Sequence, residues 1–270
     1  MYVISAVAMN ITETSIIVDS VHLNRRVMVS LYSSADEGLS QTPSLLLLND
    51  GQEAPNLNLP AALEDLYESN RIRPIVIAAI HAGKERINEY GTAGKPDFKQ
   101  RGAKADLYTS FVTEELLPEI CRETGIEAFD KTAFAGFSLG GLSALDIAWN
   151  HPEVFDAVGV FSGSLWWRER DLKDGYTDSD RIMHKIIREG DSKPDLKFFL
   201  QTGTKDELAD RNQNGIIDSI DDTIDLIIEL ENKGYTRPAD ISYLEVIGGR
   251  HDILTWAANM PKFLCWAFSR

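Results

Sequence analysis

The segment from Thr132 to Trp149, TAFAGFSLGGLSALDIAW, constrains the fold of this chain more than any other. It begins with an apolar, strand-like run and then turns sharply at Gly136–Gly140. Beyond the turn, Leu142, Leu145 and Trp149 recur at helical spacing. A strand, a glycine-flanked turn and a helix form the setting in which a G-x-S-x-G sequence presents its serine as a nucleophile.

The glycines of this turn give a physical reason to assign a role to Ser138. The turn strains the backbone at the serine, and a Cβ atom at either flank would clash. The serine hydroxyl would then stand clear of the sheet, and the N–H of Leu139 would be free to stabilise an oxyanion. The alternative is an ordinary glycine-rich turn between a strand and a helix. Residues further along the chain favour the nucleophile.

Strand patterns and helix patterns alternate along the chain, which predicts a single α/β domain over residues 1–270 with right-handed crossovers. Strands are expected near residues 16–18, 27–31, 45–48, 74–80, 133–134, 157–162, 196–201 and 241–247. Besides the helix after Ser138, helices are expected near residues 59–66, 107–118, 182–187, 224–230 and 254–268. A polar loop rich in glycine, lysine and arginine should occupy residues 81–103.

The net charge of the chain is −15, from 42 acidic and 27 basic residues. Nucleic acids and anionic membrane surfaces are bound by basic faces, so the charge argues against both as partners. No apolar run is long enough to span a membrane, and the N-terminal sequence lacks a signal-peptide pattern. These features favour a cytoplasmic protein. They do not decide whether the protein forms a homo-oligomer.

A serine hydroxyl becomes a good nucleophile only when an oriented base takes its proton. In enzymes that use this turn, the acid and then the histidine follow the serine in sequence. Three histidines follow Ser138. His151 is expected at a helix end, and His184 on the exposed face of a polar helix. His251 follows the last predicted strand and a pair of glycines, so it is the predicted base.

The acid that orients the histidine should follow the strand at residues 196–201. The sequence there reads TGTKDELAD and offers Asp206, Glu207 and Asp210. Asp206 is nearest the strand end, at the turn that Gly203 allows, and is the first candidate. Glu207 is the second, because spacing alone does not separate neighbours.

A second oxyanion donor should come from the loop after residues 45–48, where the chain reads Asn49-Asp50-Gly51-Gln52. A backbone N–H performs this role, so the side chains give only indirect information. We favour the N–H of Gln52 and keep Gly51 as the alternative. An ordinary Asp-Gly turn would have the same sequence.

The sequence DRNQNGIIDSID after the acid candidates matches the pattern of a calcium loop with glycine at the sixth position. The matching ligand positions are Asp210, Asn212, Asn214, Ile216 through its carbonyl, Asp218 and Asp221. Aspartate stands at the twelfth position, where glutamate is usual. The alternative is a polar Asn-Gly turn. A bound Ca²⁺ would be structural and would brace the loop that carries Asp206.

Seven short motifs spread over the chain resemble one family. They are NDGQE at 49–53, RINEYG at 86–91, EELLPEI at 114–120, GFSLGGLSAL at 136–145, HPEVF at 151–155, FSGSLWW at 161–167 and GGRHDILTW at 248–256. Together they resemble the putative-esterase branch of the α/β-hydrolases, which includes esterase D-like, feruloyl, acetylxylan and enterochelin esterases. The resemblance implies a mostly parallel sheet with antiparallel N-terminal strands. It also implies a triad of Ser138, His251 and Asp206 (or Glu207), without a catalytic cofactor.

The expected activity is hydrolysis of a small-molecule carboxylic ester through an acyl-enzyme. Trp166, Trp167 and Arg168 follow a strand at the edge of the sheet where ligands bind. If exposed, the two tryptophans would suit an aromatic acyl group such as a catecholate or ferulate, including that of a siderophore trilactone; the alternative is that one of them is buried. Arg86, Arg168 or Arg250 could meet negative charge. A thioesterase or acyltransferase of the same fold is one alternative. A non-catalytic binding protein that keeps the fold is the other.

Overall fold

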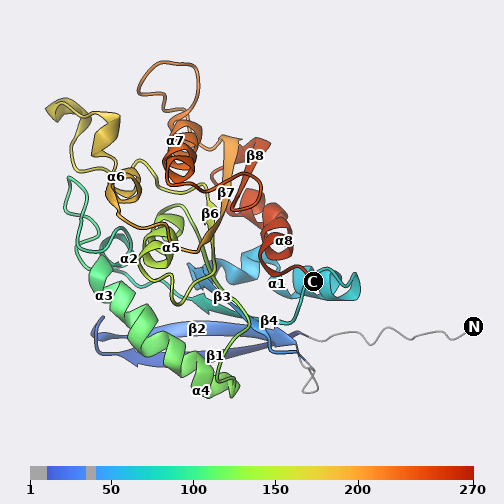
Figure 1. The fold of residues 1–270 in the computed structure, drawn as a ribbon. Helices are drawn as coiled ribbons and strands as arrows, with labels where there is room; N and C mark the ends of the chain where they lie inside the picture. Colours follow the sequence, from blue (N-terminus) through green and yellow to red (C-terminus); the bar gives the residue numbers. More distant parts are fainter. Residues whose placement is uncertain (1–10, 35–40) are drawn as a thin grey trace, which may run out of the picture.

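The computed structural model describes residues 11–34 and 41–270. Eight strands form one sheet in the order β1-β2-β4-β3-β5-β6-β7-β8 (Figure 1). The strands are β1 Ile11–Ser20, β2 Arg25–Ser34, β3 Ser44–Asn49, β4 Ile75–Ile80, β5 Thr132–Phe137, β6 Ala157–Phe161, β7 Lys197–Lys205 and β8 Ile241–Arg250. β1 pairs antiparallel with β2, β2 pairs antiparallel with β4, and the remaining pairs are parallel. This confirms the predicted fold class.

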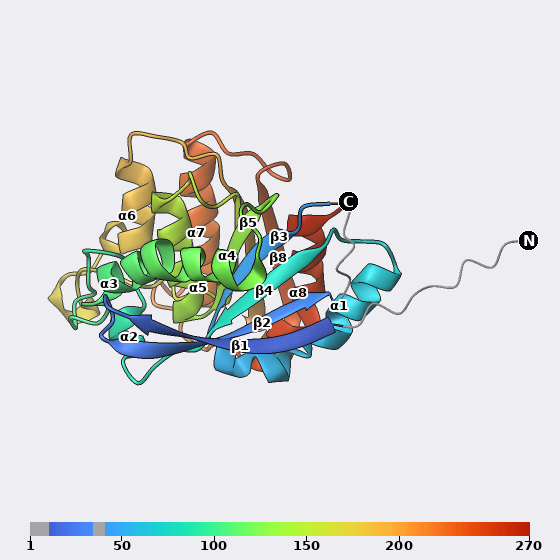
Figure 2. The ribbon, with the colours of Figure 1, turned by 90° about the horizontal axis from the view of Figure 1, so that it is seen from below.

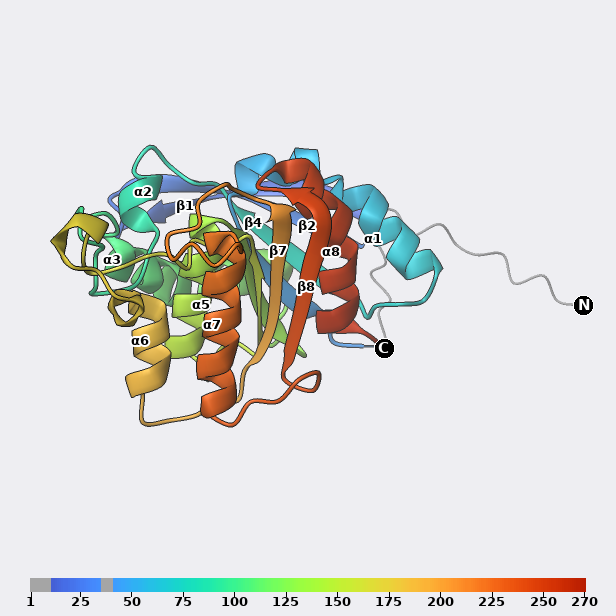
Figure 3. The same cartoon turned by 90° about the horizontal axis from the view of Figure 1, so that it is seen from above.

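Helices cover both faces of the parallel part of the sheet (Figures 2 and 3). They are η1 Gly51–Leu57, α1 Leu59–Glu68, α2 Arg86–Glu89, α3 Ala105–Ser110, the π-helical turn Phe111–Leu116, α4 Leu117–Thr124, α5 Leu139–Asn150, η3 Leu172–Asp174, η4 Asp178–Asp180, α6 Ile182–Glu189, α7 Asp218–Asn232 and α8 Ile253–Phe268. Within the described ranges, no helix is both long and apolar enough to cross a bilayer.

The central strands are apolar on both sides because both sides are covered. All six residues of β3 are buried, and so are all six of β4. Alternate residues of β3 enter different cores: Leu45 and Leu47 pack with α3–α7, whereas Leu46 and Leu48 pack with η1, α1 and α8. This two-residue period explains why a continuous apolar run predicted a buried parallel strand.

His184 was expected to be exposed, and the structure shows that this prediction is wrong. Its side chain on α6 is fully buried, and its Nε2 donates to the carbonyl oxygen of Asp222 on α7 at 2.8 Å. Burial lowers its pKa to about 3, with a smaller contribution from Arg181, so the ring is neutral at physiological pH. On α6, His184 thus faces a polar partner on α7, whereas Arg188 and Glu189 are exposed.

The carboxyl ends of the parallel strands meet at one edge of the sheet, where ligands bind in open α/β folds. β3 ends at Asn49 and β5 ends just before Ser138. β7 leads into Asp206, and β8 ends just before His251. Residues more than 200 positions apart in sequence are therefore delivered to the same region.

Candidate active site

Ser138 occupies a strained turn between β5 and α5. Its backbone has φ 52° and ψ −122°, a conformation that a non-glycine residue rarely adopts. A Cβ atom on Gly136 would lie 2.3 Å from the carbonyl oxygen of Gly140, and one on Gly140 would lie 2.7 Å from Asp50 Oδ2. Both glycines of the turn are therefore required on steric grounds, and the strain holds the serine at the end of the sheet.

Backbone N–H groups are available near Ser138 from two segments. Leu139 is the first residue of α5, and Gly51 and Gln52 open the short helix η1. Helix-opening N–H groups lack intrahelical acceptors. None of these three N–H groups donates to another described residue. The arrangement offers one donor from α5 and one from η1 to an oxyanion.

A hollow of about 220 Å³ opens in front of the serine. It is lined by Asp50, Gln52, Glu53, Arg86, Phe137, Ser138, Ile253 and Trp256. The Oγ atom of Ser138 lies 3.3 Å from Oγ of the buried Ser164, a contact that the sequence pattern did not reveal. Its only signal was the second serine of the FSGS motif.

His251 lies just beyond β8, with its ring packed edge-on against Trp256 at a centroid distance of 5.2 Å. Trp256 in turn stacks on Phe137, beside the serine, at 4.9 Å. The residue as a whole is exposed, although neighbouring protein atoms partly desolvate its ring, and among the described residues it makes no hydrogen bond to Ser138. Catalytic hydrogen bonds often tighten only when substrate binds. The indole ring of Trp256 thus contacts both His251 and Phe137, the residue before Ser138.

Several charges act on the pKa of His251. Burial is the largest influence and lowers it, Asp206 and Asp252 raise it, and Arg86 lowers it. The net effect is a pKa below the usual value. A histidine with a lowered pKa is neutral at physiological pH and can accept a proton.

Asp206 lies beside His251, and its Oδ2 accepts a hydrogen bond from the N–H of Gly203 at 2.9 Å. Burial raises the pKa of this carboxyl, whereas the N–H of Gly203, the hydroxyl of Ser162 and the charge of His251 lower it. Ser162 also accepts a hydrogen bond from Nε1 of Trp256 at 3.0 Å. The sequence pattern did not reveal Ser162 or Trp256 as neighbours of the acid.

Glu207 has different surroundings from those of Asp206. Burial raises its pKa, the charge of Asp218 raises it further, and the N–H of Ser219 lowers it. Both neighbours belong to α7, and His251 does not act on it. The charge of His251 thus acts on the pKa of Asp206 and not on that of Glu207, which supports Asp206 as the first candidate.

The two adjacent tryptophans, both expected to contact substrate, differ in exposure. Trp167 is 0% exposed and packs beside Gly91 and Gly102, so that expectation is wrong for this residue. Trp166 is half-buried, with the guanidinium of Arg101 over its ring at 5.0 Å and that of Arg168 at 6.0 Å. Substrate binding by Trp166 and Arg168 stays a prediction, and Arg101 is an additional cation beside Trp166.

Arg86 lines the hollow, but its guanidinium is bound to protein. Nε donates to Asp50 Oδ1 at 2.6 Å and Nη2 donates to Asp50 Oδ2 at 2.7 Å. The guanidinium thus forms a bidentate ion pair that the sequence analysis did not predict, and its contact with substrate stays a prediction. From the sequence alone, the partner 36 residues earlier was not apparent.

The loop expected to bind calcium is folded around its own hydrogen bonds. Asp210 accepts from the N–H groups of Asn214 and Gly215, at 3.1 and 2.9 Å. Asp221 Oδ2 accepts from the side-chain amides of Asn212 and Asn214, at 3.0 and 2.7 Å. The described residues contain no group of three or more His, Cys, Asp or Glu side chains that could hold a metal. Calcium binding stays a prediction.

Asp218, at the ninth position of the loop pattern, does not face the other candidate ligands. Its carboxylate accepts from the N–H of Arg211 at 2.8 Å and pairs with the guanidinium of the same residue at 3.2 Å. Ile216 is 44% exposed. Without Asp218, the candidate calcium ligands are the side chains of Asp210, Asn212, Asn214 and Asp221 and the carbonyl oxygen of Ile216.

If calcium binds this loop, saturating calcium should raise the melting temperature by about 5 °C, because the ion binds only the folded loop. Magnesium should be a poor substitute, since it demands a strict octahedral site. Asp210→Ala should abolish the response and leave Ser138 reactive. Thermal melts in calcium and in chelator, with elemental analysis, measure this. Identical melts without bound metal would identify the loop as a turn only.

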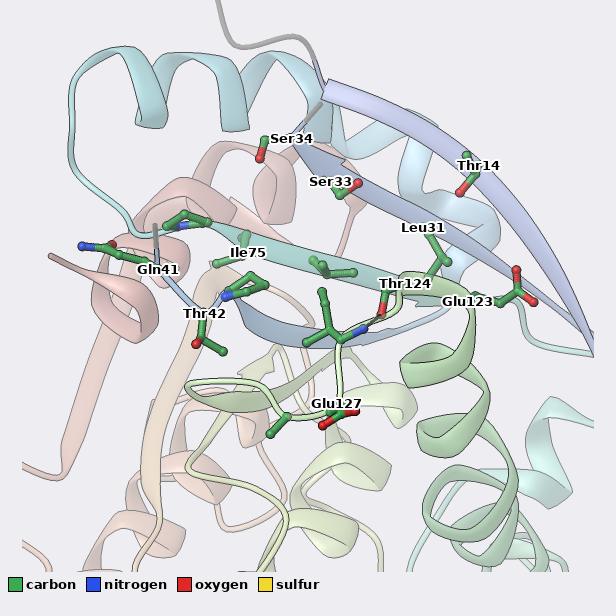
Figure 4. Close-up of a pocket in the computed structure, with 15 residues that line it drawn as sticks. Thr14, Leu31, Ser33, Ser34, Gln41, Thr42, Ile75, Glu123, Thr124 and Glu127 are labelled. Atoms are coloured by element: carbon green, nitrogen blue, oxygen red, sulfur yellow. Dashed lines mark hydrogen bonds between the residues drawn. The ribbon is translucent and has the colours of Figure 1, made fainter. Parts of the chain in front are cut away.

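A larger hollow, of about 780 Å³, lies at the opposite end of the sheet, between the start of β3, the start of β4 and the end of α4 (Figure 4). Glu123 and Glu127 are the charged residues of its described lining, which includes no His, Lys or Arg. Its described lining offers serine hydroxyls but no histidine that could activate one. The smaller hollow at Ser138 is therefore the candidate active site.

Comparisons with known proteins agree with this geometry. The iron(III) enterobactin esterase of Escherichia coli (strain K12) is 25% identical over 263 residues, covering 95% of this chain and 57% of that protein. The chain thus spans little more than half the length of the curated enterobactin esterases that it matches.

Solved structures show the same fold. The enterobactin esterase from Shigella flexneri, crystallised with enterobactin, gives a TM-score of 0.72 at 23% identity, covering 95% of this chain and 58% of that one. A ferulic acid esterase gives 0.71 at 17% identity, covering 96% of this chain and 98% of its own. A family model described as "Putative esterase" matches residues 20–267. The chain therefore belongs to the putative esterase family, with the α/β-hydrolase fold.

Proposed function

We propose that this protein is a serine carboxylic-ester hydrolase in which Ser138, His251 and Asp206 form the catalytic triad. The observation that carries the proposal is the strained turn at Ser138, with free N–H groups of Leu139 and Gln52 on either side. Asp206 acts on the pKa of His251, as the acid of a triad should. Family membership supports ester hydrolysis.

The reaction would proceed through an acyl-enzyme. His251 takes the proton of Ser138 while Oγ attacks the ester carbonyl carbon, and the N–H groups of Leu139 and Gln52 bind the resulting oxyanion. Collapse breaks the bond to the alcohol, which leaves with the proton from His251. Water, deprotonated by His251, then attacks the acyl group, and the acid is released as the serine regains its proton.

The acyl group would be aromatic. Trp166 presents a partly exposed indole, and the guanidinium groups of Arg101 and Arg168 lie over it. An aromatic ring that carries oxygen substituents can stack on the indole and meet the cations. Related proteins named for enterobactin and for ferulic acid support this class of substrate. No cofactor would be needed for catalysis.

A substrate panel tests the proposal. Trilactone siderophore, methyl ferulate and short p-nitrophenyl esters should all be hydrolysed, with the highest kcat/KM for an aromatic acyl ester. A fluorophosphonate should label Ser138 and stop turnover. A purified, folded protein that hydrolyses none of these esters and is not labelled would point to a binding protein that keeps the fold.

A further inference from the structure

The ion pair between Arg86 and Asp50 is built more rigidly than a surface pair. Both guanidinium–carboxylate hydrogen bonds are short, at 2.6 and 2.7 Å, and Asp50 is only 5% exposed. The guanidinium of Arg86 also lies over the ring of the buried Tyr90, at 5.0 Å. A planar bidentate pair of this kind fixes the orientation as well as the position of both groups.

Asp50 lies in the turn that leads to Gln52, one of the two proposed oxyanion donors. It directly precedes Gly51 and Gln52, and its own backbone is left-handed, with φ 61°. Its N–H donates to the hydroxyl of Tyr90 at 3.2 Å, and its Oδ1 accepts from Nε2 of Gln52 at 3.3 Å. The orientation of the Gln52 backbone therefore depends on the carboxylate of Asp50.

The same carboxylate also lies close to the segment that carries Leu139, the other proposed donor. A Cβ atom on Gly140, the residue after Leu139, would lie 2.7 Å from Asp50 Oδ2. The neighbouring Asn49 donates from Nδ2 to the carbonyl oxygen of Gly140 at 2.8 Å. The carboxylate of Asp50 is thus close to both backbone segments that carry the proposed oxyanion donors, Gln52 and Leu139.

A negative charge at this position would oppose catalysis if it were left alone. In a partly dry site, a nearby carboxylate raises the energy of a developing oxyanion. Burial lowers the pKa of Arg86, but its hydrogen bonds to Asp50 and the charge of that carboxylate outweigh this, so the pKa is raised and the guanidinium stays charged. The charge of Arg86 therefore offsets that of Asp50.

We propose that the Arg86–Asp50 pair is a positioning element of the oxyanion hole. It orients the N–H groups of Gln52 and Leu139, and it cancels the carboxylate charge beneath the oxyanion. The inference rests on the proposed esterase function of Ser138. In this proposal Arg86 stabilises the transition state indirectly, by positioning the N–H groups of Gln52 and Leu139, and it does not contact the substrate.

Arg86→Gln should leave the carboxylate of Asp50 unpaired and lower kcat about 100-fold, with KM changed less than about threefold. The double variant Arg86→Gln/Asp50→Asn removes the charge but not the loss of positioning, so it should regain about tenfold of that loss and stay about tenfold below wild type. Steady-state kinetics with p-nitrophenyl acetate and methyl ferulate measure both. A raised KM with unchanged kcat, and no recovery in the double variant, would assign Arg86 to substrate binding and overturn the inference.

The pH profile gives a second readout that a purely structural role would not change. The charged groups that act on His251 are Asp206 and Asp252, which raise its pKa, and Arg86, which lowers it. Removing the charge of Arg86 should therefore raise the pKa of His251. The acid limb of kcat/KM should move to higher pH in Arg86→Gln, and an unmoved limb would count against the proposal.

The pair between Arg25 and Glu89 provides a matched control. It is also bidentate, at 2.8 and 2.7 Å, its glutamate is 2% exposed, and it anchors the other end of α2. Arg25→Gln should lower the melting temperature but change kcat less than about twofold. Equal losses of kcat in Arg25→Gln and Arg86→Gln would reduce the Arg86–Asp50 pair to a structural anchor.

Labelling separates this inference from the function on which it rests. If fluorophosphonate labels wild-type Ser138 but kcat of Arg86→Gln is unchanged, only the inference fails. If wild type is neither labelled nor active, both fail. Should Arg86→Gln not fold, as its melting curve would show, the double variant decides. Its kcat should lie about tenfold below that of wild type, and an equal kcat would overturn the inference.

Discussion

Ser138→Ala should lower kcat for ester hydrolysis by about 10⁴- to 10⁶-fold while the fold stays intact, because no other group replaces the attacking Oγ. His251→Ala should cost about as much. The double variant should cost little more than either single one, since members of a triad act as a unit. Turnover of p-nitrophenyl acetate, measured beside circular dichroism, tests this.

Ser143→Ala is a suitable control for this experiment. Ser143 lies in the same helix α5 and is 1% exposed, so its replacement perturbs a buried serine without removing the nucleophile. It should retain most of the activity. Near-full activity of Ser138→Ala would mean that the hydrolysis does not use this serine.

Asp206→Asn should lower kcat by about 10⁴-fold, whereas Glu207→Gln should lower it less than about tenfold. An asparagine cannot stabilise the imidazolium that forms on His251, and it favours the wrong tautomer of the ring. Because Asp206 raises the pKa of His251, the acid limb of the remaining activity should also move to lower pH. The opposite ranking of the two variants would transfer the acid role to Glu207.

The sequence predicted the parts of the fold that depend on local pattern. β3 and β4 are continuous apolar runs, which only a strand buried on both faces explains at that length. The turn at Ser138 was predictable because its two flanking glycines stand within five residues of each other, and a Cβ atom on Gly136 would meet the backbone of Gly140. The steric partner of Gly140 itself is the distant Asp50, which the sequence pattern did not reveal.

What the sequence did not predict depends on partners that are distant in the chain. Trp166 and Trp167 look alike in sequence, and only the approach of Gly91 and Gly102 buries the second. A polar pattern around His184 indicated exposure, but Asp222 supplies a buried partner from another helix. Such pairings follow from tertiary packing, which residue periodicity does not encode.

The order of the strands also determines which part of the molecule controls inactivation. The nucleophile follows β5, in the middle of the sheet, whereas the proposed base and acid follow β8 and β7 at its margin. β8 has a neighbour on one side only, and its pairing with β7 is irregular between Gly203 and Lys205. Strands at the edge of a sheet unfold locally at a lower free energy than strands at its centre. Mild denaturant would therefore abolish turnover through local opening of this margin, at concentrations where the central strands and the serine remain folded.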